Sequence, residues 1–184
     1  MDECFPRSKV LPKQSPLYWV GNKARYLRQL LIRDIQDATD RDLIVYFTDT
    51  DRCMLQIDGG DDQHLIELLL GCTRGKVDLL LETNGGATDA TEKVCSILRR
   101  LAPDLRVFVP RRAKSNGTVV ALAGHTIVMS ASSELGPIDP WFNNVPVEFV
   151  INAPAGTMNV IELQIAQTFK KQTMKLAGAL LSTE

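Results

Sequence analysis

The chain alternates between segments whose apolar residues recur every three to four positions and short runs that are apolar throughout. The first spacing is that of one helix face, and the second is typical of buried strands. The helical spacing predicts helices over residues 23–38, 61–72, 87–101, 115–124 and 158–181. The apolar runs predict strands over residues 43–47, 53–57, 77–82, 105–109 and 126–130. Helices that alternate with strands in this way form βαβ units, so we expect an α/β fold with a mainly parallel sheet.

The first residues of the chain do not share this pattern. Residues 1–22 contain Pro6, Pro12 and Pro16 but few periodic apolar residues, which predicts an irregular N-terminal arm. Residues 23–184 contain no internal repeat, low-complexity tract or linker between domains. We therefore expect a single domain over residues 23–184 that ends in a long helix.

Two polar loops follow strands of the predicted sheet and lead directly into helices. They are Thr83-Asn84-Gly85-Gly86 and Arg111-Arg112-Ala113-Lys114-Ser115-Asn116-Gly117. Sites in parallel α/β sheets lie at the carboxyl ends of the strands, where loops of this kind meet. We therefore expect the two loops to converge on one spot.

The chemistry of these loops suits a nucleophile. Ser115 opens a helix, where serine most often caps the unpaired amides. Gly85 and Gly86 let the backbone approach a ligand closely, although a glycine-rich turn can also be purely structural. Taken together, a hydroxyl at a helix start that faces amides of a second loop is the geometry of a nucleophile beside an oxyanion hole.

Composition and charge exclude several classes of function. Apolar residues make up 45% and charged residues 23%, which is typical of a globular protein rather than a disordered one. The net charge of −1 gives little attraction to phosphate, so we expect no nucleic-acid partner. No apolar run has the roughly 18–20 residues that a membrane span requires, and the N-terminus lacks the apolar core of a signal peptide. We therefore expect a cytoplasmic protein without an integral membrane segment.

The few cysteines and histidines argue against metal chemistry. The four cysteines are widely scattered, so reduced and mostly buried thiols are expected: Cys4, Cys53, Cys72 and Cys95. The two histidines, His64 and His125, cannot supply a multi-histidine metal site, and they leave few candidates for a Ser-His-Asp triad. We expect no metal and no organic cofactor.

Four strings in the chain occur in an order known from other proteins. They are Asn84-Gly85-Gly86, Ala113-Lys114-Ser115-Asn116-Gly117-Thr118, Ile127-Val128-Met129 and Leu135-Gly136-Pro137-Ile138-Asp139-Pro140. At these strings, and over roughly residues 24–141, the sequence resembles the serine dehydrogenase proteinase family. That family belongs with the Clp protease proteolytic subunit, signal peptide peptidase A and the crotonases.

The resemblance implies a fold and an activity. The fold would be a Clp-protease/crotonase-like spiral of ββα units. The activity would be that of a serine peptidase acting on a peptide or protein substrate, with Ser115 as the nucleophile and the amides of Gly86 and Asn116 as the oxyanion donors. Relatives assemble into rings or other oligomers, so the resemblance also implies a homo-oligomer.

The sequence departs from the family pattern at three positions. Asn84 stands where the family usually has proline, Asn116 where it has alanine, and Trp141 where it has glutamine. Only the backbone amide of Asn116 is needed for an oxyanion hole, but its side chain could crowd the acyl pocket. The three departures leave open a divergent or inactive member.

Several residues compete for the role of general base. His125 follows Ser115 at the far end of the short predicted helix, so we expect it at the surface or at a strand edge. Signal peptide peptidase A uses a lysine further along the chain, and the corresponding window, residues 155–170, contains one lysine, Lys170. Burial would lower the pKa of such a lysine so that it could be neutral.

Three further residues stay open as alternatives to Lys170. Lys171 is its neighbour on the predicted final helix, whose solvated face also favours lysines. Lys114 adjoins the serine, but adjacent side chains at a helix start diverge. Asp139 is a polar residue in the family string, although aspartate before a proline also suits a turn.

Two other functions remain possible on this fold. The first is a catalytically inactive scaffold or interaction protein. The second is a crotonase-type acyl-CoA enzyme, whose oxyanion hole also uses two loop amides. The basic cluster of Arg111, Arg112 and Lys114 is either a solvated loop or a surface that attracts acidic peptide or acyl-CoA phosphates.

Overall fold

The computed structural model describes residues 16–50, 55–138, 141–142, 145–146 and 160–181. Its contacts divide the chain into two compact units, Met1–Thr39 and Asp40–Glu184. The sequence suggested a boundary after residue 22 instead. A single domain over residues 23–184 stays a prediction.

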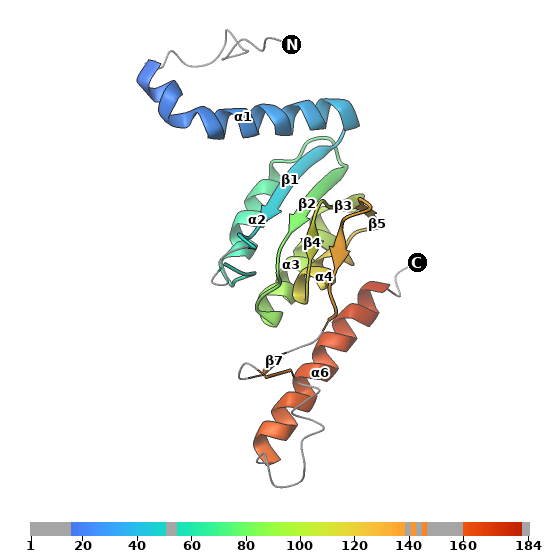
Figure 1. The fold of residues 1–184 in the computed structure, drawn as a ribbon. Helices are drawn as coiled ribbons and strands as arrows, with labels where there is room; N and C mark the ends of the chain where they lie inside the picture. The colour runs from blue at the N-terminus through green and yellow to red at the C-terminus, as the bar shows by residue number, and fades with distance from the viewer. Residues whose placement is uncertain (1–15, 51–54, 139–140, 143–144, 147–159, 182–184) are drawn as a thin grey trace. The chain divides into compact units, whose positions relative to one another are not determined.

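The described part of the first unit is helix α1 (Pro16–Thr39), drawn in blue in Figure 1. The helix begins at Pro16 rather than at residue 23, so residues 16–22 are helical and the expected irregular arm is wrong there. Proline suits the first position of a helix, because the amide that it lacks would have no partner inside the helix. Residues 1–15 of the expected arm lie outside the described residues.

The second unit is built on a four-stranded parallel sheet. Its strands are β1 (Asp42–Phe47), β2 (Val77–Glu82), β3 (Leu105–Val109) and β5 (Thr126–Met129), and they lie in that order. The register aligns Ile44, Leu79 and Val107, which are buried, with Ile127, which is partly buried against the same core. The predicted α/β class with a mainly parallel sheet is therefore confirmed.

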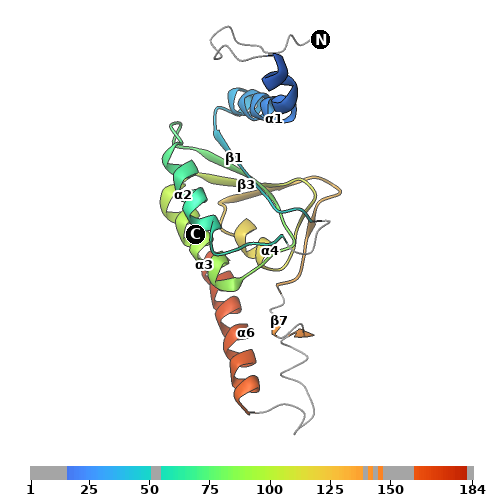
Figure 2. The same ribbon diagram turned by 90° about the vertical axis from the view of Figure 1, so that its left-hand side faces the viewer.

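Three helices connect successive strands of this sheet. They are α2 (Asp61–Leu70), α3 (Thr88–Leu101) and α4 (Asn116–Ala121). Figure 2 shows them on the same side of the strands, as right-handed crossovers in a sheet of this strand order require. Leu81 and Val107 of the sheet and Leu98 and Val119 of the helices are completely buried, so the core lies between these two layers.

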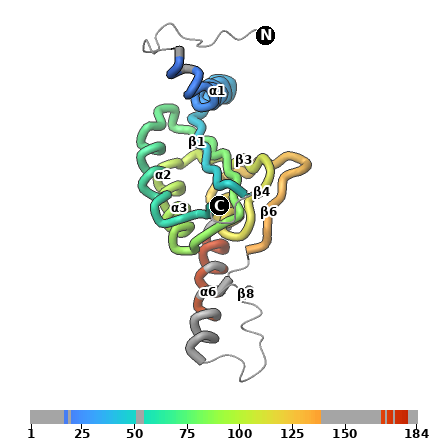
Figure 3. Tube along the Cα trace, turned by 60° about the vertical axis from the view of Figure 1, so that its left-hand side comes forward, coloured from blue at the N-terminus to red at the C-terminus, as the bar shows by residue number. Residues whose placement is uncertain are grey.

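Two short strands, β4 (Arg112–Ala113) and β6 (Glu134–Leu135), form a separate small sheet beyond the carboxyl end of β3. After β3 the chain forms β4, which pairs in parallel with β6, and Figure 3 shows the two beside each other. A further parallel bridge joins Thr83 to Ala113. The order β3, β4, α4 is therefore a ββα unit, in agreement with the Clp-protease-like spiral.

The C-terminal part contains β7 (Trp141–Phe142), which pairs antiparallel with β8 (Val145–Pro146), and the long helix α6 (Val160–Leu181). The helix α6 packs against α4. None of the helices in the described ranges is both long enough and apolar enough to cross a membrane.

The structure corrects two of the expected elements. No strand forms over residues 55–57, where Ile57 makes only an isolated bridge to Gly86, and residues 51–54 lie outside the described residues. The helix expected over residues 115–124 ends at Ala121, and Ser115 precedes its first residue.

A buried ion cluster joins the amino ends of the strands. The side chain of Asp78 on β2 is fully buried and accepts hydrogen bonds from Arg41 Nε at 2.5 Å and from Arg106 Nε at 3.0 Å and Nη2 at 2.7 Å. Arg41 also pairs with Asp104 at 2.9 Å. The cluster thereby ties the residue before β1 to β2 and β3.

Candidate active site

Ser115 occupies a sharp turn between β4 and α4. Its backbone has φ 52° and ψ −124°, in the positive-φ region that residues other than glycine rarely adopt. Such a conformation costs about 1–3 kcal/mol and persists only where the surrounding structure enforces it. A strained turn from a strand into a helix also presents the nucleophile in the α/β-hydrolases.

The hydroxyl of Ser115 does not serve the helix that it precedes. The side chain makes no capping hydrogen bond to α4, so the interpretation of Ser115 as an ordinary helix cap is wrong. Within the described residues, the Ser115 Oγ has no hydrogen-bond partner. A half-buried hydroxyl in a strained turn is therefore left available for chemistry.

The diglycine bend lies directly against this serine. Gly85 has φ +104°, and a Cβ placed there would lie 3.0 Å from the Ser115 Cβ and 3.1 Å from the Asn116 backbone nitrogen. A Cβ at Gly86 would lie 2.3 Å from the Ile57 carbonyl oxygen. Both glycines are thus required for the close approach, and the two loops converge as the sequence predicted.

Ile57 determines the orientation of the Gly86 peptide groups. The Ile57 amide donates to the Gly85 carbonyl at 2.9 Å, and the Ala87 amide donates to the Ile57 carbonyl at 3.0 Å. In such a parallel bridge the N–H and C=O of Gly86 itself point to the opposite side. That side is occupied by Asn116, whose Nδ2 donates to the Gly86 carbonyl at 2.6 Å.

Two backbone amides in these loops, those of Gly86 and Asn116, have no hydrogen-bond acceptor among the described residues. Asn116 directly follows Ser115, and Gly86 belongs to the diglycine bend that packs against it. Unpaired N–H groups stabilise the oxyanion of acyl transfer when they lie beside the nucleophile.

The side chain of Asn116 links the two loops. It is buried, and its Nδ2 donates to the Gly86 carbonyl and, at 3.1 Å, to the Thr88 hydroxyl. Crowding of an acyl pocket by this side chain stays a prediction. Its hydrogen bond holds Gly86 in the facing loop.

The nearer candidate bases are occupied elsewhere. Lys114 Nζ pairs with Glu134 on β6 at 2.9 Å, and this contact holds the pKa of the Glu134 carboxyl below its usual range. His125 lies at the amino end of β3, where its Nδ1 accepts a hydrogen bond from the Leu105 amide at 3.3 Å. The prediction of a strand-edge histidine is confirmed, since Ser115 lies at the opposite end of the strands.

Two of the remaining candidates, Lys170 and Lys171, lie on α6. Lys170 is half-buried and is two helical turns before Ala177, which is buried, whereas Lys171 is exposed. Among the described contacts, none joins Lys170 to Ser115. Asp139 lies outside the described residues. The structure thus brings together Ser115, Gly86 and Asn116, and the base stays a prediction.

A polar cluster beside the site was not anticipated from the sequence. Arg111 pairs with Glu82 at 2.8 Å and donates to the Thr50 hydroxyl, while Arg112 donates to the Thr50 carbonyl at 3.3 Å. Asn84 also donates to the Thr50 carbonyl, at 2.8 Å. Thr50 follows the carboxyl end of β1, so the rule that loops meet at this edge could have indicated it. Arg111 is thus ion-paired although it is exposed, and the half-buried Arg112 is hydrogen-bonded to the same loop.

The described part of the chain offers no metal centre. Within it, no three or more histidine, cysteine, aspartate or glutamate side chains are grouped so that they could hold a metal ion.

Comparison with known proteins agrees with this geometry. A family model described as "ClpP-like SDH-type serine proteinase" matches residues 58–177, which include the serine, both amides and Lys170. The chain is 30% identical over 118 residues to the uncharacterized protein MJ0137 of Methanocaldococcus jannaschii. The aligned residues make up 64% of this chain and 39% of that protein. It is 31% identical over 77 residues to the uncharacterized protein MJ1495 of the same organism, and these residues make up 42% of this chain and 26% of that protein.

These matches differ in what they cover. The chain spans less than half the length of either curated relative. The family model, by contrast, matches well over half of this chain and includes both loops of the site. The chain therefore belongs to the family of ClpP-like SDH-type serine proteinases.

Proposed function

We propose that the chain is a serine peptidase that hydrolyses peptide bonds with Ser115 as its nucleophile. The observation that carries the proposal is the strained turn at Ser115, packed against Gly85 so closely that no side chain fits between them. Strain of this kind is expected where a fold positions a reactive group. Membership of a serine proteinase family supports the same assignment.

In the proposed mechanism the Ser115 Oγ attacks the carbonyl carbon of the scissile peptide bond. The carbonyl oxygen becomes an oxyanion that accepts hydrogen bonds from the Gly86 and Asn116 amides. Loss of one such donor typically slows acyl transfer about 10²–10³-fold. Collapse of the intermediate breaks the C–N bond, and the base returns the serine proton to the nitrogen of the leaving amine. Water then hydrolyses the acyl-enzyme.

The serine proton requires a base, and we assign that role to Lys170. Support comes from its position in the window that the resemblance indicates and from its half-buried place on α6, the helix that packs against α4. A neutral lysine must come within about 3 Å of the hydroxyl to accept its proton. Lys171, which is exposed, is the weaker candidate.

A serine-directed fluorophosphonate probe tests the proposal directly. The wild-type protein is expected to be labelled, and Ser115→Ala is expected to abolish labelling. Ser96→Ala is a matched control, because Ser96 lies on the exposed side of α3 and donates to the Glu92 carbonyl. Equal labelling of the wild type and Ser115→Ala, or no labelling of either, would contradict the proposal.

An inactive scaffold is the second candidate function. It is favoured by one observation, namely that no described contact joins Ser115 to a base. An acyl-CoA enzyme has less support, because the arginines that would bind its phosphates already have partners in the chain. Arg111 binds Glu82 and the Thr50 hydroxyl, and Arg112 binds the Thr50 carbonyl. Thermal stabilisation by acyl-CoA but not by peptide would favour the acyl-CoA enzyme.

A further inference from the structure

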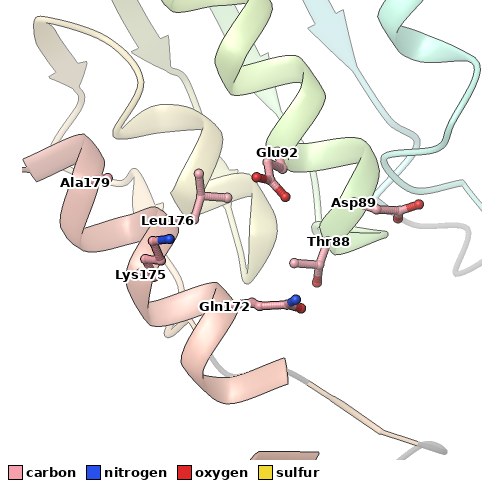
Figure 4. A pocket seen from close by; sticks show the side chains of 7 residues that line it. All are labelled: Thr88, Asp89, Glu92, Gln172, Lys175, Leu176 and Ala179. Atoms are coloured by element: carbon pink, nitrogen blue, oxygen red, sulfur yellow. The ribbon is translucent and has the colours of Figure 1, made fainter. Parts of the chain in front are cut away.

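A cavity of about 480 Å³ lies between the first turn of α3 and helix α6. Figure 4 shows the lining residues on both helices, with Thr88 and Glu92 of α3 on the side toward Gln172 and Lys175 of α6, and Asp89 at the outer edge. Its volume falls within the roughly 300–1,000 Å³ typical of ligand sites. No step of the proposed mechanism uses these residues.

The cavity adjoins the proposed oxyanion hole through a single side chain. Thr88, which lines the cavity, accepts a hydrogen bond from Asn116 Nδ2 at 3.1 Å. The same Nδ2 donates to the Gly86 carbonyl at 2.6 Å. The cavity is therefore separated from Gly86 and Asn116 by the Thr88 side chain alone.

The lining of the cavity has an excess of negative charge. Asp89 and Glu92 are neighbours three residues apart on α3, both are exposed, and both belong to the lining of the cavity. Lys175 contributes one positive charge from the other wall. In the described part of the chain, no ion pair joins Lys175 to either carboxylate. The two carboxylates thus remain available to a ligand cation.

The lining of the cavity also contains an apolar side chain, Leu176. Leu176 packs against the hydrophobic core and borders the cavity on the α6 side. Lysine and arginine side chains combine an apolar stem with a cationic head, and they cover apolar surface with the stem while the head meets a charge. A lysine or arginine side chain therefore fits both the charge and the polarity of the lining.

We propose that this cavity is a substrate subsite that selects a lysine or arginine side chain close to the scissile bond. The inference rests on the proposed peptidase function, since it assumes that a peptide runs past Ser115. Asp89 and Glu92 bind the cationic head, and Leu176 contacts the stem. Lys175 weakens the selection, because its charge repels the same ligand.

Binding to the non-cleaving full chain tests the subsite. Fluorescence anisotropy of the Ser115→Ala protein is measured with three labelled peptides, acetyl-Ala-Ala-X-Ala-Ala, in which X is lysine, norleucine or glutamate. The lysine peptide is expected to bind about fivefold more tightly than the norleucine peptide, which corresponds to about 1 kcal/mol. The glutamate peptide is expected to bind most weakly.

Charge variants assign the selection to the cavity. In the Ser115→Ala background, Asp89→Asn with Glu92→Gln is expected to remove the preference for lysine, and Lys175→Gln is expected to increase it. Glu67→Gln is the matched control, because Glu67 is an exposed carboxylate on α2 outside the cavity. Thermal melting verifies that each variant is folded.

The outcomes separate the subsite from the peptidase. Equal binding of the three peptides, no measurable binding of any, or a lysine preference that survives the double variant would overturn the subsite. Fluorophosphonate labelling of the wild type would then still support the peptidase. If labelling fails but the cavity carboxylates still select lysine, the peptidase proposal falls and the cation-selective cavity stands.

Discussion

The side chain of Asn116 has a role at the scale of a single residue. Its Nδ2 fixes the Gly86 carbonyl at 2.6 Å, and the amide of that same glycine is one of the two proposed oxyanion donors. Asn116→Ala is expected to reduce kcat about tenfold with little change in KM, because both amides remain but one is held less firmly. Steady-state peptide hydrolysis or the rate of fluorophosphonate labelling measures the effect. An Asn116→Ala protein as fast as the wild type would show that the side chain positions nothing.

Gly85 is a second residue on which the site depends. A Cβ there would lie 2.8 Å from the Lys114 carbonyl oxygen, and the φ of +104° is unfavourable for any L side chain. Gly85→Ala is therefore expected to abolish labelling and to lower the free energy of unfolding by more than about 1 kcal/mol. Gly59→Ala is the control, because nothing lies within 4 Å of a Cβ at that position. Chemical denaturation should separate the two variants clearly.

Cys95 is expected to give the unfolding free energy a pH dependence. Burial raises the pKa of its thiol from 9.0 to about 12. Between these values the unfolded chain releases the proton and the folded chain keeps it, so stability falls as the pH rises. The slope contributed by one proton approaches about 1.4 kcal/mol per pH unit. Urea unfolding at several pH values between 9 and 11 measures it.

The comparison variant for this pH dependence is Cys95→Ala. It lacks the titrating thiol, so its stability is expected to fall less steeply over the same interval. Parallel slopes for the two proteins would mean that the Cys95 thiol is not the group responsible.

At the scale of secondary structure, the buried Asp78 holds strands together. Asp78→Ala leaves Arg41 and Arg106 without the carboxylate that joins them, and removing one partner of a buried ion pair is strongly destabilising. We expect a loss of about 3 kcal/mol. Asp104→Asn is the control, since Asp104 is exposed and its removal should change the urea midpoint much less. Similar midpoints for the two variants would contradict a structural role for Asp78.

The sequence predicted those elements whose stability comes from their own apolar pattern. The runs that became β2 and β3 are apolar and mostly buried, and α3 has an apolar face toward the core, so their spacing was informative. The strands β4 and β6 could not be predicted, because each has two residues and is defined only by its pairing with a distant segment. The prolines and the few periodic apolar residues of residues 1–22 predict an irregular arm, but residues 16–22 are helical, because Pro16 suits the first position of α1.

The candidate site was only partly predictable for a related reason. Ser115 and the diglycine bend follow strand ends, and the parallel-sheet rule places such loops together from sequence alone. The strain at Ser115 and the hydrogen bonds of Asn116 depend on the contact between the two loops, so no local pattern indicates them. The reach of Lys170 depends on how α6 packs, which residue spacing does not determine.

At the scale of the molecule, the central sheet exposes apolar residues on the face away from its helices. The register aligns Val45, Leu80, Phe108 and Val128 across all four strands, and on β1 the side chains of Val45 and Phe47 are 43% and 59% exposed. Parallel sheets in known proteins are covered on both faces. This feature supports the expected homo-oligomer, in which a second copy would cover the exposed side chains.

Light scattering coupled to size-exclusion chromatography tests the assembly. The wild type is expected to elute as an oligomer, and Phe47→Lys should shift it to smaller species, because a charge would replace apolar surface in the interface. Leu70→Lys is the control, since Leu70 is an exposed apolar residue at the end of α2. A monomeric wild type would contradict the expectation.

The turn at Ser115 also bears on how the family can change over time. Glycine would adopt a φ of 52° without strain, whereas serine keeps this turn less stable than it could be. A lineage that no longer used the hydroxyl would therefore gain stability by drifting to glycine at this position. The identity of a single residue in related sequences would then distinguish degenerate copies from working enzymes.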